Sequence, residues 1–331
     1  MRNAIGLWLP EFWQRRGAMN RLLWPVSGLY AVVADARRRA YRRGWLKSVR
    51  LPAFVVVVGN LTAGGAGKTP LVIRLAEAFR DIGCRPGVVS RGYGGRTARA
   101  PRRVVPDSDP LEVGDEPALI ARRTGMPVVV CARRADAARE LIERLRCDVI
   151  IADDGLQHYA LARDVEIAVV DGTTRLGNGW RLPAGPLRES PDRLTTVDFV
   201  VCNGGPAGPG ESAMALVPTA LCRVRDFSAV GSVSDLRGLR VHAVAGIGRP
   251  GRFFATLRDL GAETIEHPFP DHHRFTAADL DFHDDLPVVM TEKDAVKCNG
   301  FAGPRCLFLR VDARIESGFL ERLINRQTSH A

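Results

Sequence analysis

The sequence PAFVVVVGNLTAGGAGKTPLVIRLAEAFRDIG, residues 52–83, predicts the fold of the chain. Its first seven residues form a short apolar run rich in valine, which is typical of a buried parallel strand. A glycine-rich loop follows, and apolar residues then recur at helical spacing from residue 71. A strand, such a loop and a helix, in this order, are what a phosphate-binding P-loop requires. We therefore expect an α/β fold with a P-loop NTPase-like domain built on a mostly parallel sheet.

The residues of this loop indicate how it would hold a phosphate. Glycines let backbone N–H groups curl around phosphate oxygens, and the helix N-terminus adds positive potential. Lys68 would reach the β- and γ-phosphates, and the Thr69 hydroxyl would bind Mg²⁺. The strict pattern G-x-x-x-x-G-K-[ST] has glycine where this chain has Thr62, so Gly64 and Gly65 must supply the flexibility. The alternative interpretation is a glycine turn with an incidental lysine.

Polar residues follow two other apolar runs. The run VIIA precedes Asp153 and Asp154, and an aspartate at the tip of a neighbouring strand suits an Mg²⁺ site. A helix cap or a turn is the alternative. The loop SRGYGGR carries Arg91 and Arg96, and it could contact an anionic substrate or simply be solvated. Open α/β sheets bind ligands at the carboxyl ends of their strands, so we expect these residues at one edge.

Composition limits the class of protein. The chain has 331 residues, enough for roughly two domains, and a formal net charge of +10. Residues 1–50 hold 11 of the 47 Lys and Arg residues but only 2 of the 37 acidic ones, so the remainder is almost neutral. We therefore expect no nucleic-acid partner. The seven cysteines form no CxxC, which indicates a reducing cytosol rather than disulfides or zinc. Lysine is rare, and the four are Lys47, Lys68, Lys293 and Lys297.

The N-terminal segment, residues 1–50, is hydrophobic and basic. Four of the five tryptophans lie in its first 45 residues. Its longest uncharged run, residues 22–34, is 13 residues long, whereas a bilayer-spanning helix needs about 20. We expect a helical segment that lies in the interface of an anionic membrane. The alternatives are a signal peptide cleaved near residues 34–36 and a helical pair packed on the catalytic domain with solvated arginines.

The remaining chain divides into three parts. We expect the P-loop domain over 51–205, a linker region over 206–235 and a second, smaller α/β domain over 236–331, and the run GGPAGPG at 204–210 indicates the linker. Local sequence favours Asp115, in GDEP, as a helix cap. It likewise favours the adjacent histidines of FPDHH as solvated loop residues, with metal binding as the alternative.

Seven motifs in order resemble the tetraacyldisaccharide 4'-kinases, a family also called lipid A 4'-kinases. The motifs are GNLTAGGAGKTP, SRGYGG, GDEP, DDGLQH, GNGWRLPAGPLRE, FPDHH and TEKDAVK, from about residue 59 to 297. The resemblance implies an enzyme at the cytoplasmic face of the bacterial inner membrane. It would use ATP and Mg²⁺ to phosphorylate the 4'-hydroxyl of a tetraacylated glucosamine disaccharide 1-phosphate, giving lipid IVA. We expect no obligate protein partner.

The resemblance also implies roles for residues. It makes Asp115 the general base, assisted by His272, and it assigns Mg²⁺ to Thr69, Asp153 and Asp154. Asp115 and His272 are 157 residues apart, so we expect the second domain to close on the first when substrate binds. The residues expected to bind ATP are Thr62, Ala63, Gly64, Gly65, Ala66, Gly67, Lys68 and Thr69. The weaker candidates for substrate contacts are Arg91, Arg96, Arg188 and Glu189.

Two other functions remain open. A ParA-like ATPase, a nucleotide switch that acts on a partner protein, would carry a lysine directly before the glycine pair, where this chain has Ala63. A P-loop kinase with another small acceptor would not need an N-terminus rich in tryptophan and arginine.

Overall fold

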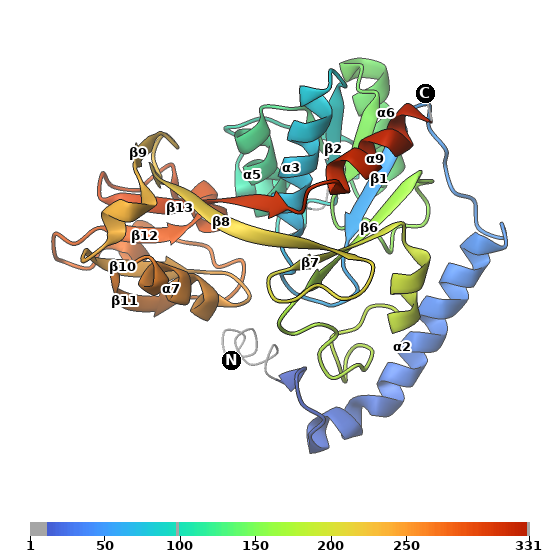
Figure 1. The fold of residues 1–331 in the computed structure, drawn as a ribbon, viewed down its shortest axis with the longest axis horizontal. Helices are drawn as coiled ribbons and strands as arrows, with labels where there is room; N and C mark the ends of the chain where they lie inside the picture. Colours follow the sequence, from blue (N-terminus) through green and yellow to red (C-terminus); the bar gives the residue numbers. More distant parts are fainter. Residues whose placement is uncertain (1–11, 97–98, 330–331) are drawn as a thin grey trace.

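The computed structural model describes residues 12–96 and 99–329, so residues 1–11 of the expected N-terminal segment lie outside the described part. Its centre is one 13-stranded sheet in which most neighbouring strands are parallel, and this confirms the predicted α/β fold (Figure 1). From edge to edge the strands are β11 (Glu263–Pro268), β10 (Arg240–Ala245), β12 (Val288–Thr291), β13 (Cys306–Ile315), β8 (Glu211–Arg223), β7 (Phe199–Asn203), β6 (Val165–Asp171), β1 (Phe54–Gly59), β5 (Val149–Ala152), β2 (Pro86–Ser90), β4 (Val128–Val130) and β3 (Arg102–Val104), and β9 (Ala229–Gly231) pairs with β8.

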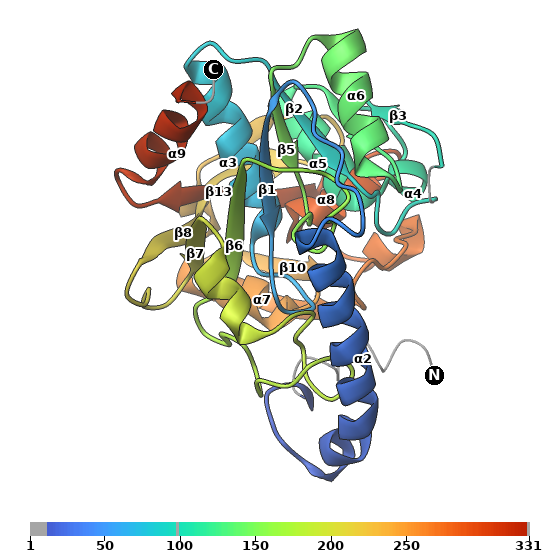
Figure 2. The same cartoon turned by 90° about the vertical axis from the view of Figure 1, so that its right-hand side faces the viewer.

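Helices pack on the sheet, and one long helix, α2 (Ala18–Arg42), runs along the outside of the molecule (Figure 2). The further helices are α3 (Lys68–Asp81), α4 (Pro110–Val113), α5 (Asp115–Thr124), α6 (Arg134–Leu145), α7 (Pro250–Asp259), α8 (Glu292–Cys298) and α9 (Phe319–Thr328), with 3-10 turns η1 (Pro191–Thr196), η2 (Val233–Leu236) and η3 (Ala277–Leu280).

Strand β1 is buried on both sides because its residues alternate between two apolar cores. Phe54, Val56 and Val58 belong to the core that contains residues of α3, α5 and α9. Val55 and Val57 belong to the core that contains residues of α6. Helices on both faces explain why the strand reads as an unbroken apolar run. Because β1, β2, β5 and β6 pair in parallel, the loops that follow them lie at one edge of the sheet.

The long antiparallel strands β8 and β13 pass between two lobes of the molecule (Figure 1). The first lobe holds β1 to β7. The second holds β10, β11 and β12, with α7 and α8 packed on it. Residues 206–235, expected as a linker region, include β8 and β9 and are therefore part of the sheet. The glycines of GGPAGPG form the turn that leads into β8.

Helix α2 contacts the rest of the protein through its polar residues. Asn20 and Ser27 are buried, and they hydrogen-bond to the backbone of residues 181 and 184. The opposite side exposes an apolar stripe at three- and four-residue spacing. No helix in residues 12–96 and 99–329 has the length and apolar character of a bilayer span. The stripe, named the α2 apolar stripe below, consists of Met19, Leu22, Val26, Leu29 and Val33.

Candidate active site

The phosphate loop lies between β1 and the first turn of α3. Gly67 caps α3 in a left-handed conformation with φ +90°, and a Cβ there would lie 2.3 Å from Asn203 Nδ2. Only glycine fits such a position. Lys68 begins the helix, where its ammonium donates to Asn60 Oδ1 at 3.1 Å and lies 3.5 Å from Asp154 Oδ1. The tight turn at Gly67 thus directs the Lys68 side chain across the phosphate loop, toward Asn60 and Asp154.

Thr62 stands where the strict pattern has glycine, and the structure explains why threonine is accommodated. Its backbone forms a β-bridge with Leu187, and further backbone hydrogen bonds join the loop to the segment 183–189. A residue in such a bridge does not need a positive φ. The left-handed conformations fall instead at Gly64 and Gly67.

Asp154 is held between two cations. Arg188 Nη1 donates to both carboxylate oxygens at 2.9 Å, and Lys68 approaches from the phosphate loop. Burial raises the pKa of Asp154, but the charges of Lys68 and Arg188 outweigh it and lower the pKa to about 2. Arg188, expected to contact substrate, therefore makes its ion pair with an expected metal ligand.

Asp153 is the neighbouring carboxylate, and it is almost completely buried. Within the described residues its Oδ1 has no hydrogen-bond partner. Burial, together with the charges of Glu116 and Asp154, raises its pKa to about 7 against the opposing effect of Lys68 and Arg134. An unpartnered buried carboxylate oxygen is costly, and a bound cation would remove that cost.

Asp115 and His272 are brought together although they are far apart in sequence. His272 Nδ1 lies 2.9 Å from Asp115 Oδ2. Asp115 is the first residue of α5, and the cap is Gly114 rather than the aspartate. His272 lies after β11, with its ring edge-on to Tyr93 at a centroid distance of 5.2 Å. The contact joins the two lobes, because α5 belongs to the first and the loop after β11 to the second.

The pKa of Asp115 lies below its usual value. Burial raises it, but the hydrogen bond from His272 and the charges of Lys297 and Lys293 outweigh this effect. The side chain is therefore a carboxylate at neutral pH. A carboxylate with a histidine as its hydrogen-bond partner can take a proton from a hydroxyl group.

A cavity opens beside the phosphate loop, and both lobes line it. Asp271, which precedes His272, and Arg249 come from the second lobe. The cavity therefore lies between the phosphate loop and the second lobe, and neither Asp115 nor His272 lines it. Its other lining residues are Trp13, Gln14, Thr62, Ala63, Gly64, Gly65, Thr174, Arg175, Gly177, Pro186 and Gly248.

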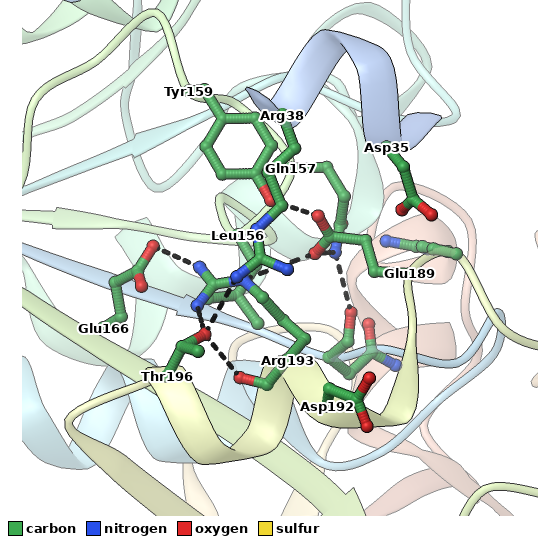
Figure 3. Close-up of polar contacts among 12 residues, drawn as sticks. Asp35, Arg38, Leu156, Gln157, Tyr159, Glu166, Glu189, Asp192, Arg193 and Thr196 are labelled. Atoms are coloured by element: carbon green, nitrogen blue, oxygen red, sulfur yellow. Dashed lines mark hydrogen bonds and ion pairs between the residues drawn. The ribbon is translucent and has the colours of Figure 1, made fainter. Parts of the chain in front are cut away.

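None of the four weaker candidates for substrate contacts lines this cavity, and Arg188 pairs with Asp154 instead. Arg91 and Arg96 are exposed in the loop after β2, and Arg96 pairs with Glu112 at 3.1 Å. Glu189 is only 5% exposed and accepts hydrogen bonds from Gln157 and from the Tyr159 hydroxyl (Figure 3). It belongs to a buried polar network that also contains Arg193, next to α2.

Sequence reasoning missed several polar residues around the site. Arg134 Nη2 donates to the backbone carbonyls of Asp153 and Asp154, at 3.2 and 2.8 Å. Arg249 and Arg252, at the start of α7, both pair with Asp171 at the end of β6, which joins the lobes a second time. Arginine is the most frequent basic residue in this chain, so nothing in the local sequence distinguishes Arg134, Arg249 and Arg252.

A glycine loop that presents a lysine at the edge of a parallel sheet handles nucleotide phosphates, and the nearby carboxylate–histidine pair suits a hydroxyl acceptor. By class, the chain is a P-loop phosphotransferase. Comparison with known proteins gives the family. The family model described as tetraacyldisaccharide-1-P 4'-kinase matches residues 19–328, and the chain belongs to this family.

Relatives match over nearly the whole chain. A tetraacyldisaccharide 4'-kinase of Alkalilimnicola ehrlichii is 54% identical over 317 residues, which cover 95% of each protein. One of Aromatoleum aromaticum is 52% identical and covers 96% of this chain and 97% of the relative. The crystal structure described as the "apo" form of LpxK from Aquifex aeolicus in complex with ATP has a TM-score of 0.80 and 29% identity. That match covers 94% of this chain and 99% of the other.

Proposed function

We propose that this protein transfers the γ-phosphate of ATP to the 4'-hydroxyl of a tetraacylated glucosamine disaccharide 1-phosphate, giving lipid IVA. The hydroxyl oxygen forms a bond to the γ-phosphorus, the bond to the β–γ bridging oxygen breaks, and ADP leaves. The observation that carries this proposal is the 2.9 Å contact between Asp115 and His272, beside the phosphate loop. The names of the relatives supply the acceptor.

ATP is proposed to bind at residues 62–69. The left-handed Gly67, the start of α3 and the position of Lys68 support this assignment. The solved relative described with ATP supports it too. When ATP binds, the Lys68 ammonium would exchange its contacts with Asn60 and Asp154 for contacts with the terminal phosphates, because it already lies beside the phosphate loop.

Asp153, Asp154 and Thr69 fit an Mg²⁺ ion. Asp153 offers a buried oxygen that no described residue satisfies, and carboxylate and hydroxyl oxygens are the ligands Mg²⁺ prefers. The ion would neutralise charge on the β- and γ-phosphates. Arg188 and Lys68 already balance Asp154, so Asp153 is the stronger candidate for direct contact.

Asp115 is proposed to accept the proton of the attacking hydroxyl. A carboxylate with a low pKa is a weak base, but phosphoryl transfer has a loose transition state in which positioning matters most. His272 holds the carboxylate through Nδ1, and it would share the positive charge that the proton brings. We also propose that the second domain closes on the first. The Asp115–His272 contact and the ion pairs of Asp171 with Arg249 and Arg252 already join the lobes in this structure, and they are the contacts that the closed state would keep.

The N-terminal helix is proposed to lie in the cytoplasmic surface of the inner membrane. Its α2 apolar stripe is more than half exposed at every position, while Asn20 and Ser27 face the protein. Exposed apolar patches of this kind mark interaction surfaces. Seated there, the enzyme would reach its lipid without drawing four acyl chains through water.

The test is transfer of radiolabel from γ-labelled ATP to the disaccharide lipid as sole acceptor. We expect labelled lipid with the wild type and none with Lys68→Met. Asp115→Asn should lower kcat by about 10²- to 10⁴-fold, the usual contribution of a general base, with the KM for ATP unchanged within about threefold. Wild-type protein that leaves the lipid unlabelled would refute the proposed acceptor. An equal loss of turnover and ATP affinity in Asp115→Asn would refute the base.

A further inference from the structure

Helix α8, which carries the TEKDAVK motif, packs against α5, which begins at Asp115. Three ion pairs join the two helices. Arg123 pairs with Glu292 at 2.8 Å, Lys293 Nζ lies 3.1 Å from Glu116 Oε1, and Lys297 Nζ lies 3.9 Å from Asp115 Oδ2. Two of the four lysines in this arginine-rich chain thus meet the two carboxylates of GDEP.

Lys297 is held in a fixed place. Its side chain is 6% exposed, and its ammonium lies 2.6 Å from Asp294 Oδ1 and 4.9 Å from the centre of the Phe275 ring. Asp294 is itself fully buried, and it accepts hydrogen bonds from Gly246 N and the Thr291 hydroxyl. Within the described residues Lys297 Nζ makes no hydrogen bond, so it acts on Asp294 and Asp115 as a buried charge held close to both carboxylates.

The ammonium and the histidine approach the same oxygen of Asp115. His272 Nδ1 is 2.9 Å from Oδ2, and Lys297 Nζ is 3.9 Å from that atom. Within residues 12–96 and 99–329 the side-chain hydrogen bond of Asp115 goes to Oδ2, and none goes to Oδ1. His272 and Lys297 therefore both lie beside Oδ2, and Oδ1 remains for a substrate.

We propose that Lys297, anchored by Asp294, is a positioning residue that holds Asp115 Oδ2 and so presents Oδ1 to the acceptor hydroxyl. The inference rests on the proposed role of Asp115 as base. It adds a residue that touches neither ATP nor the sugar and acts only through the carboxylate.

Electrostatics agrees with this geometry. The charged or titratable groups that face Asp115 are His272 from the loop after β11 and Lys297 and Lys293 from α8. Glu116, on its own helix, is neutralised by Lys293, which also lies 3.5 Å from Asp271. Burial raises the pKa of Asp115, and the positive charge of Lys297 lowers it. Removing this charge must therefore raise the pKa of Asp115.

A lysine suits this place better than an arginine. An ammonium is a compact point charge, whereas a guanidinium is a wide planar group. The site is bounded by Asp294, Asp115 and the Phe275 ring.

The test compares kcat–pH profiles at saturating ATP and lipid. Lys297→Met should lower kcat about 10- to 100-fold and move the acid limb about one pH unit upward, with the KM for ATP unchanged. Lys297→Arg should keep the acid limb near the wild-type position, because the charge remains. If Lys297→Met fails to fold, Lys297→Gln keeps a polar head against Asp294 and serves the same comparison.

Arg123→Met is the matched control. It breaks a buried ion pair between the same two helices but does not touch Asp115, so it should lower Tm and leave the acid limb in place. An acid limb that stays in place in Lys297→Met, with only Tm lowered, would overturn the inference. Retained turnover in Asp115→Asn would refute the base itself. An inactive Asp115→Asn together with an unshifted Lys297→Met would refute only the role of Lys297.

Discussion

The α2 apolar stripe can be tested without disturbing the fold. Leu22 and Leu29 belong to this stripe, and their side chains are 73% and 68% exposed. Replacing both with serine removes apolar surface from the outer side of α2. The polar contacts of Asn20 and Ser27 on the inner side stay intact. A double Leu22→Ser, Leu29→Ser variant should therefore fold normally and bind membranes less tightly.

The size of the effect follows from the exposed fractions. Full burial of a leucine side chain is worth about 1.5–3 kcal/mol, and roughly 0.7 of each side chain is available, so each substitution removes about 1–2 kcal/mol. The pair then weakens partitioning by about 2–4 kcal/mol, or roughly 30- to 1000-fold. Deleting residues 1–45 would be a poorer experiment. It would also remove Asn20 and Ser27, which hold residues 181–184.

The assay is cosedimentation with anionic phospholipid vesicles at low and physiological salt. The control variant is Ile82→Ser with Leu111→Ser, since these side chains are 47% and 45% exposed away from α2. We expect the control to sediment like the wild type. Equal sedimentation of the Leu22 and Leu29 variant and the control would refute the reasoning that this face enters the membrane.

Two further predictions concern stability. Gly67→Ala should lower the free energy of unfolding by about 1–3 kcal/mol in chemical denaturation, because a left-handed alanine is strained and its Cβ meets Asn203. Gly65→Ala, where a Cβ meets nothing within 4 Å, should change it far less, and equal losses would contradict this reasoning. Burial, with nearby arginine charges, lowers the pKa of His158 to about 4. Because the unfolded chain then binds the proton first, stability should fall between about pH 6.5 and 4 by about 1–2 kcal/mol, after a discount for solvent screening. His158→Gln should reduce that slope in thermal melts at graded pH, and an unchanged slope would exclude the histidine.

Local sequence was sufficient where structure depends on neighbouring residues. The run over 52–58 became the buried centre of the sheet, and the glycine loop after it led directly into α3. Strand burial and helix periodicity are properties of about ten consecutive residues. The departure at Thr62 needed the segment 183–189 to explain it, because its β-bridge partner lies more than a hundred residues away.

Local sequence was misleading where a side chain's partner lies on another element. Asp115 reads as a helix cap, yet Gly114 holds that position and the aspartate meets His272. Arg188 and Glu189 are adjacent in sequence. The first pairs with Asp154 beside the phosphate loop, and the second enters a buried network beside α2 (Figure 3). The chain bends at these two residues, and only the surrounding packing determines what each side chain meets.

The sequence by itself determined the kind of fold, the place of the phosphate loop and, through its seven motifs, the family. Tertiary structure alone decided which charges meet. It brought Lys297 to Asp115, Arg252 to Asp171 and the polar side of α2 to residues 181–184. The physical reason is the distance along the chain over which each kind of interaction acts. Hydrogen bonding and apolar periodicity act along a few turns of chain, whereas the partner of a charged side chain depends on how separately folded lobes pack.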